Sequence, residues 1–439
     1  MLKRNFTLLI IILVIIIAVL FGWFYFFPPS TNGGGKESNF TNFLSDFLPF
    51  GGNSNNTNTD TGNTNTGGTD ISGYEDQTDD SFGEIKLKKV STFPVSGFGV
   101  FMKERFEAIA PQDDPVSGTP TPPKTELDPF VRYVEKSTGN TYQTFADDIE
   151  ERQFSSAIIP TVYEAFLGNG GESVIVRYLK DNSNNIETFW GKLPKEYLGG
   201  DTSSSNGFTG SFLPENITDM SVSQDKSKVF YLTNTSTGSI GTTLMLETGT
   251  RSQVFDSSLS EWLSSWPSDN KITLTTKPSY NTAGFMYVVN PNTKSFEKVL
   301  SGVNGLTTLM SPDGKKILYS NNNLSLYVYE LETGKSTLLG VKTLAEKCVW
   351  DDVSELVYCA VPQSVNGIEY PDSWYQGTQS FSDEIWKVNT TTGITYRIAS
   401  PINLVGVDID IIKPELDQNG DYLFFLNKKD SYLWEFNLK

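Results

Sequence analysis

The residues best suited to chemistry lie in one long segment, 363–382, where aromatic rings alternate with polar groups. Rigid aromatic side chains anchor partners at interfaces, and polar groups beside them add hydrogen bonds and specificity. We therefore predict a binding surface formed by Tyr370, Asp372, Trp374, Tyr375 and Phe381. The alternative is that these rings fold back as a lid over the edge of the sheet that carries them.

Carboxylates offer a second kind of chemistry. Two Asp or Glu side chains around a pocket carry out glycoside hydrolysis, and Asp408 and Asp410 are possible contributors. Asp417, Asn419 and Asp421 supply oxygen ligands for calcium, but without the spacing of a full calcium loop. We therefore predict no catalytic residue, metal or cofactor. A carboxylate-dependent glycan-processing enzyme remains the alternative to a binding protein.

Composition excludes several functional classes. The 439 residues contain no histidine, so the chain cannot hold a Ser-His-Asp triad, a histidine-ligated metal or a histidine pH switch. The formal net charge of −18 argues against nucleic acid as a partner, because the phosphate backbone is bound by basic patches. We expect a binding or scaffolding role toward a protein or a glycan of the cell envelope.

The two cysteines, Cys348 and Cys359, lie on either side of an expected hairpin turn between Val353 and Ser354. This register places the two cysteines directly opposite each other on adjacent strands, at a separation that a disulfide can bridge. A disulfide is stable outside the cytoplasm, whereas two buried free thiols are the alternative. A slip of one residue in the register would turn one cysteine to the other face of the sheet.

The elements that position these residues are copies of one unit, clearest at 310–339. Ser311 to Gly314 forms a tight turn between two apolar runs, and a second reversal follows at Thr333-Gly334. Four short strands in one sheet cannot bury their own faces, so the unit needs copies. Weaker versions occur along the rest of the chain, at 130–145, 161–193, 220–249, 266–294, 348–398 and 404–438.

The sequence Ser-Pro-Asp-Gly-Lys-Lys-Ile-Leu-Tyr at 311–319, with Tyr-Val-Tyr-Glu-Leu-Glu-Thr-Gly-Lys at 327–335, resembles the TolB-like, or WD40-like (PD40), propeller repeats. The resemblance implies an all-β propeller of four-stranded antiparallel blades, used in bacterial envelopes mostly as a binding platform and in some members to cap hydrolases. We count seven blades, with six or eight as alternatives. The last unit lacks a strand, which 84–90 can supply, so that the domain 84–439 closes into a ring.

An apolar run at 6–27, from Phe6 to Phe27, is long enough to cross a bilayer. Lys3 and Arg4 precede it, so the positive-inside rule places the N-terminus in the cytoplasm and the propeller outside. A cleaved signal peptide is the alternative, but no small-residue cleavage site precedes Pro28. We therefore predict that residues 1–27 are a single-pass anchor.

Residues 28–83 form an Asn/Thr/Gly-rich stretch with too few apolar residues to fold, and we expect a flexible tether. An apolar island at 39–50 interrupts it, with the helical spacing of Phe40, Phe43, Leu44, Phe47 and Leu48. The island is either an amphipathic helix on the membrane surface or a docking peptide for a partner.

Three insertions lengthen connections between strands of the blades, and long connections of this kind often carry binding residues. We predict that 111–129 and 363–382 each join the second and third strands of their blades, and therefore emerge on the same face of the ring. A third insertion, 195–206, is predicted to join the third and fourth strands of its blade and to lie on the opposite face.

Overall fold

A computed structural model of the chain describes residues 86–106 and 123–439, with short gaps at 147, 149, 157–158, 181–184, 201, 203–208 and 368. The predicted anchor 6–27, the tether 28–83 and its island 39–50 lie outside these residues. Within the described ranges, no helix combines the length and the hydrophobicity that crossing a bilayer requires.

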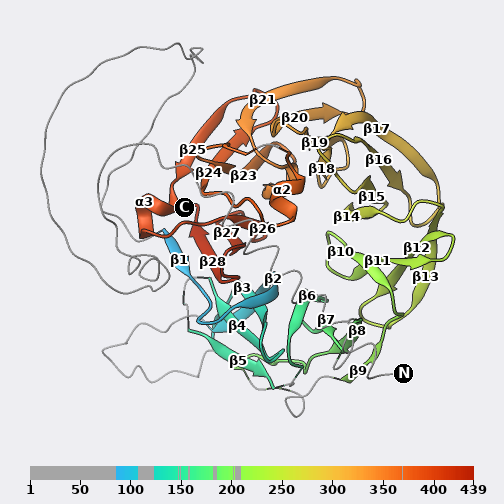
Figure 1. Cartoon of the computed structure of the whole chain (residues 1–439). Helices are drawn as coiled ribbons and strands as arrows, with labels where there is room; N and C mark the ends of the chain where they lie inside the picture. The colour runs from blue at the N-terminus through green and yellow to red at the C-terminus, as the bar shows by residue number, and fades with distance from the viewer. Residues whose placement is uncertain are drawn as a thin grey trace, which may run out of the picture. The chain divides into compact units, whose positions relative to one another are not determined.

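The described chain folds into seven four-stranded antiparallel sheets arranged as the blades of a propeller (Figure 1). In blades 1 to 6 the strands follow chain order from the inner to the outer edge. Blade 1 has β2 (Val95–Phe106), β3 (Thr125–Glu135), β4 (Thr141–Phe145) and β5 (Arg152–Ser155). Blade 2 has β6 (Val162–Gly168), β7 (Ser173–Leu179), β8 (Ile186–Lys192) and β9 (Thr209–Phe212). Blade 3 has β10 (Ile217–Val222), β11 (Lys228–Thr235), β12 (Gly238–Met245) and β13 (Arg251–Ser257).

The remaining blades repeat this arrangement. Blade 4 has β14 (Trp262–Ser268), β15 (Lys271–Thr276), β16 (Ala283–Val289) and β17 (Phe296–Asn304). Blade 5 has β18 (Thr307–Met310), β19 (Lys316–Ser320), β20 (Ser325–Glu330) and β21 (Ser336–Lys342). Blade 6 has β22 (Cys348–Trp350), β23 (Leu356–Pro362), β24 (Asp383–Asn389) and β25 (Thr395–Ala399). Blade 7 has β26 (Ile411–Leu416), β27 (Tyr422–Asn427) and β28 (Leu433–Asn437). Within the part of the chain that the structure describes, three short helices occupy connections: η3 (Ala345–Lys347), α2 (Asp372–Tyr375) and α3 (Pro401–Val405).

The outer strand of blade 7 comes from the other end of the described chain. Strand β1 (Leu87–Lys89) pairs antiparallel with β28, with Leu87 opposite Phe436 and Lys89 opposite Trp434. Sheet edges invite unwanted pairing, and this arrangement covers the outer edge of β28 while it ties the two ends of the propeller together. The count of seven blades is confirmed.

The turn of the clearest repeat is held by its own side chains. The Ser311 hydroxyl donates to Asp313 Oδ1 at 2.6 Å, and Gly314 adopts a φ of +68°. In blade 3 the Ser223 hydroxyl donates to Asp225 at the same distance, although Lys226, with a φ of 56°, stands where blade 5 has glycine. The repeated motif therefore makes hairpins, as its local chemistry predicts.

Apolar side chains pack between neighbouring blades rather than around one centre. Leu318 and Leu326 of blade 5 lie in one buried cluster with Val357 of blade 6, and Ile385 of blade 6 lies in another with Phe425 of blade 7. Each buried Å² of apolar surface contributes about 25 cal/mol, so every blade depends on the two blades beside it.

The predicted disulfide is confirmed. Cys348 and Cys359 lie opposite each other on β22 and β23 and are bonded, with 4.0 Å between their Cα atoms. The hairpin turns around Val353 and Ser354, and Ser354 takes a φ of 62°. The register needed to oppose the cysteines is therefore the one that the turn imposes.

The two long insertions of blades 1 and 6 emerge on opposite faces, so the prediction that they share a face is wrong. Strand β2 runs unbroken for 12 residues and pairs with β3 along its length, so the insertion after Phe106 joins the first and second strands of blade 1. Segment 363–382 joins the second and third strands of blade 6, β23 and β24. Because antiparallel strands alternate in direction, these two connections lie at opposite ends of the strands.

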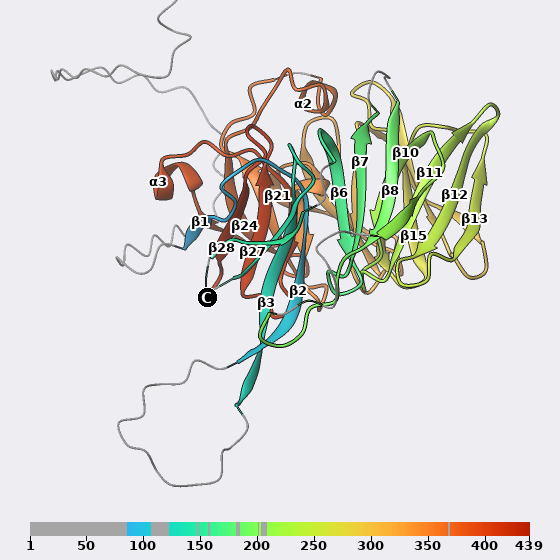
Figure 2. The same ribbon diagram turned by 90° about the horizontal axis from the view of Figure 1, so that it is seen from below.

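We call the side that carries α2 the α2 face, and the side that carries the connection between β2 and β3 the β2 face. Figure 2 shows α2 and the far ends of β2 and β3 at opposite ends of the blades. The connection between β8 and β9, which contains the third insertion, joins the third and fourth strands of blade 2 as predicted. It therefore shares the β2 face with the insertion of blade 1.

Candidate functional site

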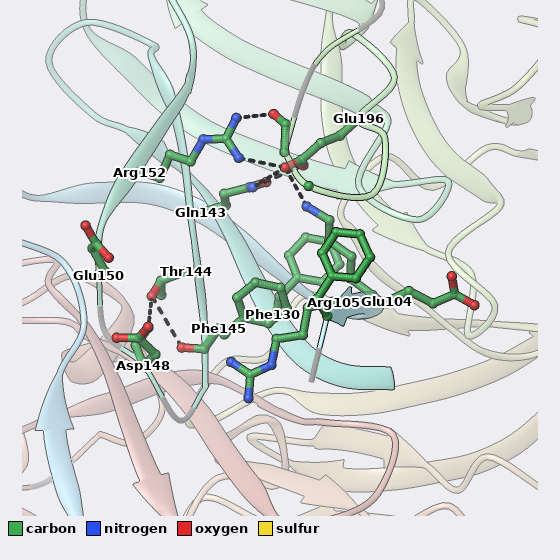
Figure 3. A pocket seen from close by; sticks show the side chains of 14 residues that line it. Glu104, Arg105, Phe130, Gln143, Thr144, Phe145, Asp148, Glu150, Arg152 and Glu196 are labelled. Atoms are coloured by element: carbon green, nitrogen blue, oxygen red, sulfur yellow. Dashed lines mark hydrogen bonds and ion pairs between the residues drawn. The ribbon is translucent and has the colours of Figure 1, made fainter. Parts of the chain in front are cut away.

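A pocket of about 390 Å³ lies on the β2 face between blades 1 and 2, where these two insertions leave the sheets. Figure 3 shows its charged and aromatic side chains. The end of β2, the strands β3, β4 and β5, the connection between β4 and β5, and the connection after β8 supply the lining. The lining residues are Lys103, Glu104, Arg105, Phe106, Phe130, Gln143, Thr144, Phe145, Asp148, Glu150, Arg152, Glu196, Gly199 and Gly200.

Close packing of the inner strands holds the two walls of the pocket in place. A Cβ atom on Gly97 of β2 would lie 1.9 Å from the carbonyl oxygen of Ala165 on β6, a distance that no side chain tolerates. Glycine therefore lets the backbones of blades 1 and 2 approach each other. The long β2 strand then extends from this contact to carry Lys103 and Arg105 to the pocket.

The Glu196 carboxylate lies at the centre of the polar network that forms the floor of the pocket. It accepts hydrogen bonds from Gln143 Nε2 at 3.0 Å and from Arg152 Nη1 at 2.9 Å. Arg132 Nη2 lies 3.1 Å away and Lys103 Nζ lies 2.5 Å away. The Glu196 side chain is 5% exposed. Four donors therefore occupy its two oxygens, which makes it an anchor of the floor rather than a free base.

Burial weakens the charged forms of two of these cations. Burial lowers the pKa of the Arg132 guanidinium to about 10, while Glu196 and Glu172 oppose the shift. The pKa of Lys103 is also lowered, first by burial and then by the charges of Arg132 and Arg152, against the attraction of Glu196. With a pKa of about 10, Arg132 is charged at neutral pH. Together with Lys103 and Arg152 it forms a cluster of three basic side chains around one carboxylate.

Aromatic rings support the cations from behind. The Arg132 guanidinium lies 3.6 Å from the centre of the Phe154 ring, and that of Arg105 lies 5.0 Å from the centre of the Phe145 ring. Arg105 is paired with Glu126 and Asp128, which neutralise it. The cation with the greatest exposure at the floor is Arg152, with 47% of its side chain accessible.

Two further groups of residues surround the floor. Glu104, Asp148 and Glu150 also line the pocket, and none of the three forms an ion pair with another described residue. Outside the floor, the large apolar residues on and beside the two walls keep 42–56% of their surface exposed: Phe106, Leu127, Tyr197 and Leu198. We call these four residues the apolar rim. Such a combination of charge and exposed apolar surface suits recognition.

The residues predicted to bind from segment 363–382 are mostly turned into the protein. Tyr370, Trp374 and Phe381 are buried together with Leu324 and Leu344 of the neighbouring blade. They form the lid that was the alternative interpretation.

The other two predicted residues make specific contacts. An Asp372 carboxylate oxygen accepts a hydrogen bond from the backbone N–H of Tyr280 at 2.5 Å. The Tyr375 hydroxyl donates to Glu346, and its side chain is 37% exposed. A direct binding role for this segment stays a prediction, and only Tyr375 offers a partner a large exposed ring.

A buried charge cluster lies next to α2. Lys347 Nζ is 2.7 Å from Asp383 Oδ2 and 2.5 Å from Asp410 Oδ1, and all three side chains are fully buried. Asp410 also accepts hydrogen bonds from Trp374 Nε1 at 3.0 Å and from the backbone of Phe381 at 3.0 Å. We call Lys347, Asp383 and Asp410 the α2 cluster.

The α2 cluster gives Asp410 a structural role that the sequence analysis did not identify, because its oxygens fasten the lid. Asp408, the other possible contributor to glycan chemistry, pairs instead with Lys429. Burial raises the pKa of Asp383 to about 6, whereas Lys347 holds the pKa of Asp410 below its usual value against the opposing effect of burial.

The carboxylates in the turn between β26 and β27, named above as possible calcium ligands, are bound by donors of the protein itself. Asp417 accepts hydrogen bonds from the backbone N–H of Asn419 at 3.0 Å and of Tyr422 at 2.6 Å, and Asp421 pairs with Lys439. Among the described residues, no group of three His, Cys, Asp or Glu side chains is placed to hold a metal ion.

Sequence reasoning missed the residues of the pocket floor. Lys103 and Arg105 alternate at the end of an apolar strand, just before an insertion, and this pattern is a local signal that the strand continues beyond the core. The remaining members, Arg132, Gln143 and Arg152, become neighbours of Glu196 only when two blades pack together. No spacing in the sequence indicates that contact.

About a quarter of the chain is similar in sequence to proteins named as Tricorn-like proteases. No protein-family model matches the chain. A putative Tricorn-like protease C-terminal subunit from Sulfurisphaera tokodaii is 33% identical over 123 residues, which is 27% of this chain and 12% of that protein. A Tricorn protease homolog from Saccharolobus solfataricus is 32% identical over 117 residues, 27% of this chain and 9% of that protein. The chain thus spans about a tenth of the length of these relatives.

Among solved structures, similar chains include oligogalacturonate lyases. One, in complex with manganese, shares 12% identity with a TM-score of 0.44 and covers 71% of this chain and 85% of its own. Another, from Vibrio parahaemolyticus, shares 10% identity with a TM-score of 0.48 and covers 71% of this chain and 86% of its own. These similarities do not assign the chain to a family.

Proposed function

We propose that the chain is a membrane-anchored binding module that presents the pocket between blades 1 and 2 to a protein of the cell envelope. The observation that carries this proposal is the pocket itself. Described residues that flank the insertions of two adjacent blades line it, and they combine a charged floor with exposed apolar residues. Recognition sites are typically built in this way on loops that a rigid scaffold positions.

The proposed location outside the cytoplasm rests on two features. The apolar run at 6–27 has the length of a bilayer span, with Lys3 and Arg4 just before it and no basic residue after it until Lys36. The disulfide between Cys348 and Cys359 belongs to an oxidising compartment. Together they support a single-pass protein of the cytoplasmic membrane with its propeller outside.

A protein fits the pocket better than a glycan because of the apolar rim. Two of its four residues, Leu127 and Leu198, are exposed aliphatic side chains, which do not provide the flat aromatic platforms on which sugar rings stack. Exposed apolar groups that border a charged pocket are typical of protein interfaces. A glycan ligand is the other outcome of the tests.

The proposal is tested by photo-crosslinking in cells. A photoreactive phenylalanine at Tyr197, on the apolar rim, is expected to capture a protein partner. The matched control is the same group at Tyr396, which is also exposed but lies on β25 of blade 6. Capture should decrease when Arg152→Glu reverses the charge at the floor. Equal capture at Tyr197 and Tyr396, or no capture at Tyr197, would contradict the proposal.

A second candidate, a carboxylate-dependent glycan-processing enzyme, is favoured by one observation away from the pocket. Burial raises the pKa of Asp219 on the inner strand of blade 3 to about 6, and burial together with the charge of Asp219 raises the pKa of Glu346. A carboxyl whose pKa is raised toward neutral pH, as that of Asp219 is, can act as a general acid. Loss of glycan turnover in Asp219→Asn, with the Asp408→Asn variant still active, would support this candidate.

A further inference from the structure

The pocket has charges of opposite sign at its floor and on its surrounding wall, and this arrangement indicates the chemistry of its ligand. We propose that it binds a peptide segment of the partner that carries both a carboxylate and a basic side chain, with the carboxylate directed to Arg152 and Lys103 and the cation directed to Glu150 and Asp148. The inference rests on the proposed function and adds the chemical class of the ligand.

The floor carries more positive than negative charge. Lys103, Arg132 and Arg152 are three cations, and the carboxylate they share is that of Glu196. Counting Glu172, which also attracts Arg132, still leaves one positive charge uncompensated. Arg152 donates from Nη1 to Glu196 and from Nη2 to the carbonyl oxygen of Gly200. Its side chain is 47% exposed, so a carboxylate of the ligand can reach the remaining N–H groups of the guanidinium without displacing Glu196.

The surrounding wall has the opposite charge. Glu104, Asp148 and Glu150 line the same pocket, and none of the three carboxylates is paired with a described cation. The nearby cation Arg105 does not compensate them, because it is paired with Glu126 and Asp128. An acidic ligand alone would be attracted by the floor and repelled by the wall. A ligand with both charges satisfies both regions, and like-charge ligands are rejected.

The size and the apolar parts of the pocket favour a short peptide. A volume of about 390 Å³ is at the lower end of the range for ligand sites and admits a few side chains. The rings of Phe106, Phe130 and Phe145 line the pocket and provide apolar contacts for the stem between the two charges. Acidic, apolar and basic side chains occur together in peptides, which is why we infer this class.

The test measures the binding of four end-blocked peptides to the full chain purified in detergent. Their sequence is Gly-X-Leu-Z-Gly, where X is Glu or Gln and Z is Lys or Gln. A charge-assisted hydrogen bond contributes roughly 1.5–3 kcal/mol, so the peptide with both charges is expected to bind at least about tenfold more tightly than the neutral one. Titration calorimetry or NMR shift mapping provides the affinities.

Two variants assign each charge to its place in the pocket. Arg152→Gln should remove the advantage of Glu at X and leave that of Lys at Z, whereas Glu150→Gln should do the reverse. Lys180→Gln is the matched control, because Lys180 forms an exposed pair with Glu187 at the connection between β7 and β8, on the α2 face. Unchanged thermal unfolding in all three variants shows that they are folded.

Equal affinities for the four peptides would overturn the inference, and so would dependence on one charge alone or equal effects of Arg152→Gln and Lys180→Gln. The proposed function would survive these results if Tyr197 still captured a protein in cells. If the four peptides bound equally and Tyr197 captured no protein, both the inference and the proposed function would be contradicted.

Discussion

The α2 cluster and the floor of the pocket use the same kinds of charged group but differ in what covers them. In the α2 cluster, Lys347 lies between two carboxylates that are fully buried, and the rings of Trp374 and Phe381 lie about 5.1 Å from its ammonium. In the pocket, three cations surround Glu196, and Arg152 remains exposed. A closed network of this kind fastens a segment, whereas an open one can bind a ligand.

The difference follows from the balance of charges as well as from burial. One cation between two carboxylates gives the α2 cluster an excess of negative charge, which hydrogen bonds from the lid compensate through Asp410. The pocket floor has an excess of positive charge and receives no further anion from the described chain beyond Glu196 and Glu172. The described chain therefore has a closed lid on the α2 face and an open pocket on the β2 face.

The largest effect is expected when the α2 cluster loses its cation. Lys347→Met leaves Asp383 and Asp410 buried without a counter-charge, and we expect a loss of about 4 kcal/mol in the free energy of unfolding. Denaturant unfolding measures the loss. The control Lys429→Met removes the exposed partner of Asp408 and should cost less than about 1 kcal/mol. Similar effects of the two substitutions would show that the α2 cluster is not a structural fastening.

The second prediction concerns pH. The folded-state pKa of Asp383 is about 6 against 3.8 for an unperturbed aspartate, so the native state binds this proton more tightly than the unfolded state. The stabilising effect is complete below about pH 4 and is lost as the pH rises through 6, by up to about 3 kcal/mol.

The variant that isolates this effect is Asp383→Asn, in which the fall in stability between pH 4 and 6 should become smaller. Unfolding curves recorded across this range provide the measurement. The pocket variant Glu150→Gln serves as the control and should leave the slope unchanged. An unaltered slope in Asp383→Asn would contradict the assignment.

The third prediction removes the anchor of the pocket floor. Glu196→Gln leaves Lys103, Arg132 and Arg152 around a neutral amide, and we expect a loss of about 2 kcal/mol, less than for Lys347→Met because Arg152 is half exposed. Denaturant unfolding and partner binding should both be measured. If Glu196→Gln changed neither the free energy of unfolding nor partner binding, Glu196 would not be the residue that organises the pocket floor.

The smallest effect is expected at the only predicted ring of the lid with large exposure. Tyr375→Phe removes the hydroxyl that donates to Glu346 and should cost about 1 kcal/mol, with no change in partner capture at Tyr197. Partner capture that falls in Tyr375→Phe or Tyr375→Ala would instead support the binding role predicted for segment 363–382 from the sequence.

The fold was predictable because its information is local. Turns such as Ser311 to Gly314 recur between apolar strands, and each reversal can be recognised from about ten residues. The opposed cysteines follow from the register of such a turn. The strand at Leu87 was predicted because the last unit lacks an outer strand, and it pairs there with β28. The face of the first insertion was assigned wrongly because β2 extends through Gly97 and Gly99 without a turn.

The site was not predictable because it depends on contacts between blades. Glu196 meets Arg132 and Arg152 across 64 and 44 residues, and the direction of each side chain decides whether they meet. The aromatic residues of segment 363–382 show the converse. Their types suggested an interface, but they are turned inward. Asp410 of the α2 cluster accepts a hydrogen bond from the Trp374 indole N–H, and this contact between distant segments has no signal in the local sequence.

The most direct test of the account is the affinity of the protein captured at Tyr197 for the purified full chain, compared with the Arg152→Gln and Lys180→Gln variants. The account predicts that affinity falls about tenfold in Arg152→Gln and is unchanged in Lys180→Gln. An equal affinity for the unmodified chain and Arg152→Gln would contradict the claim that the pocket between blades 1 and 2 is the binding site.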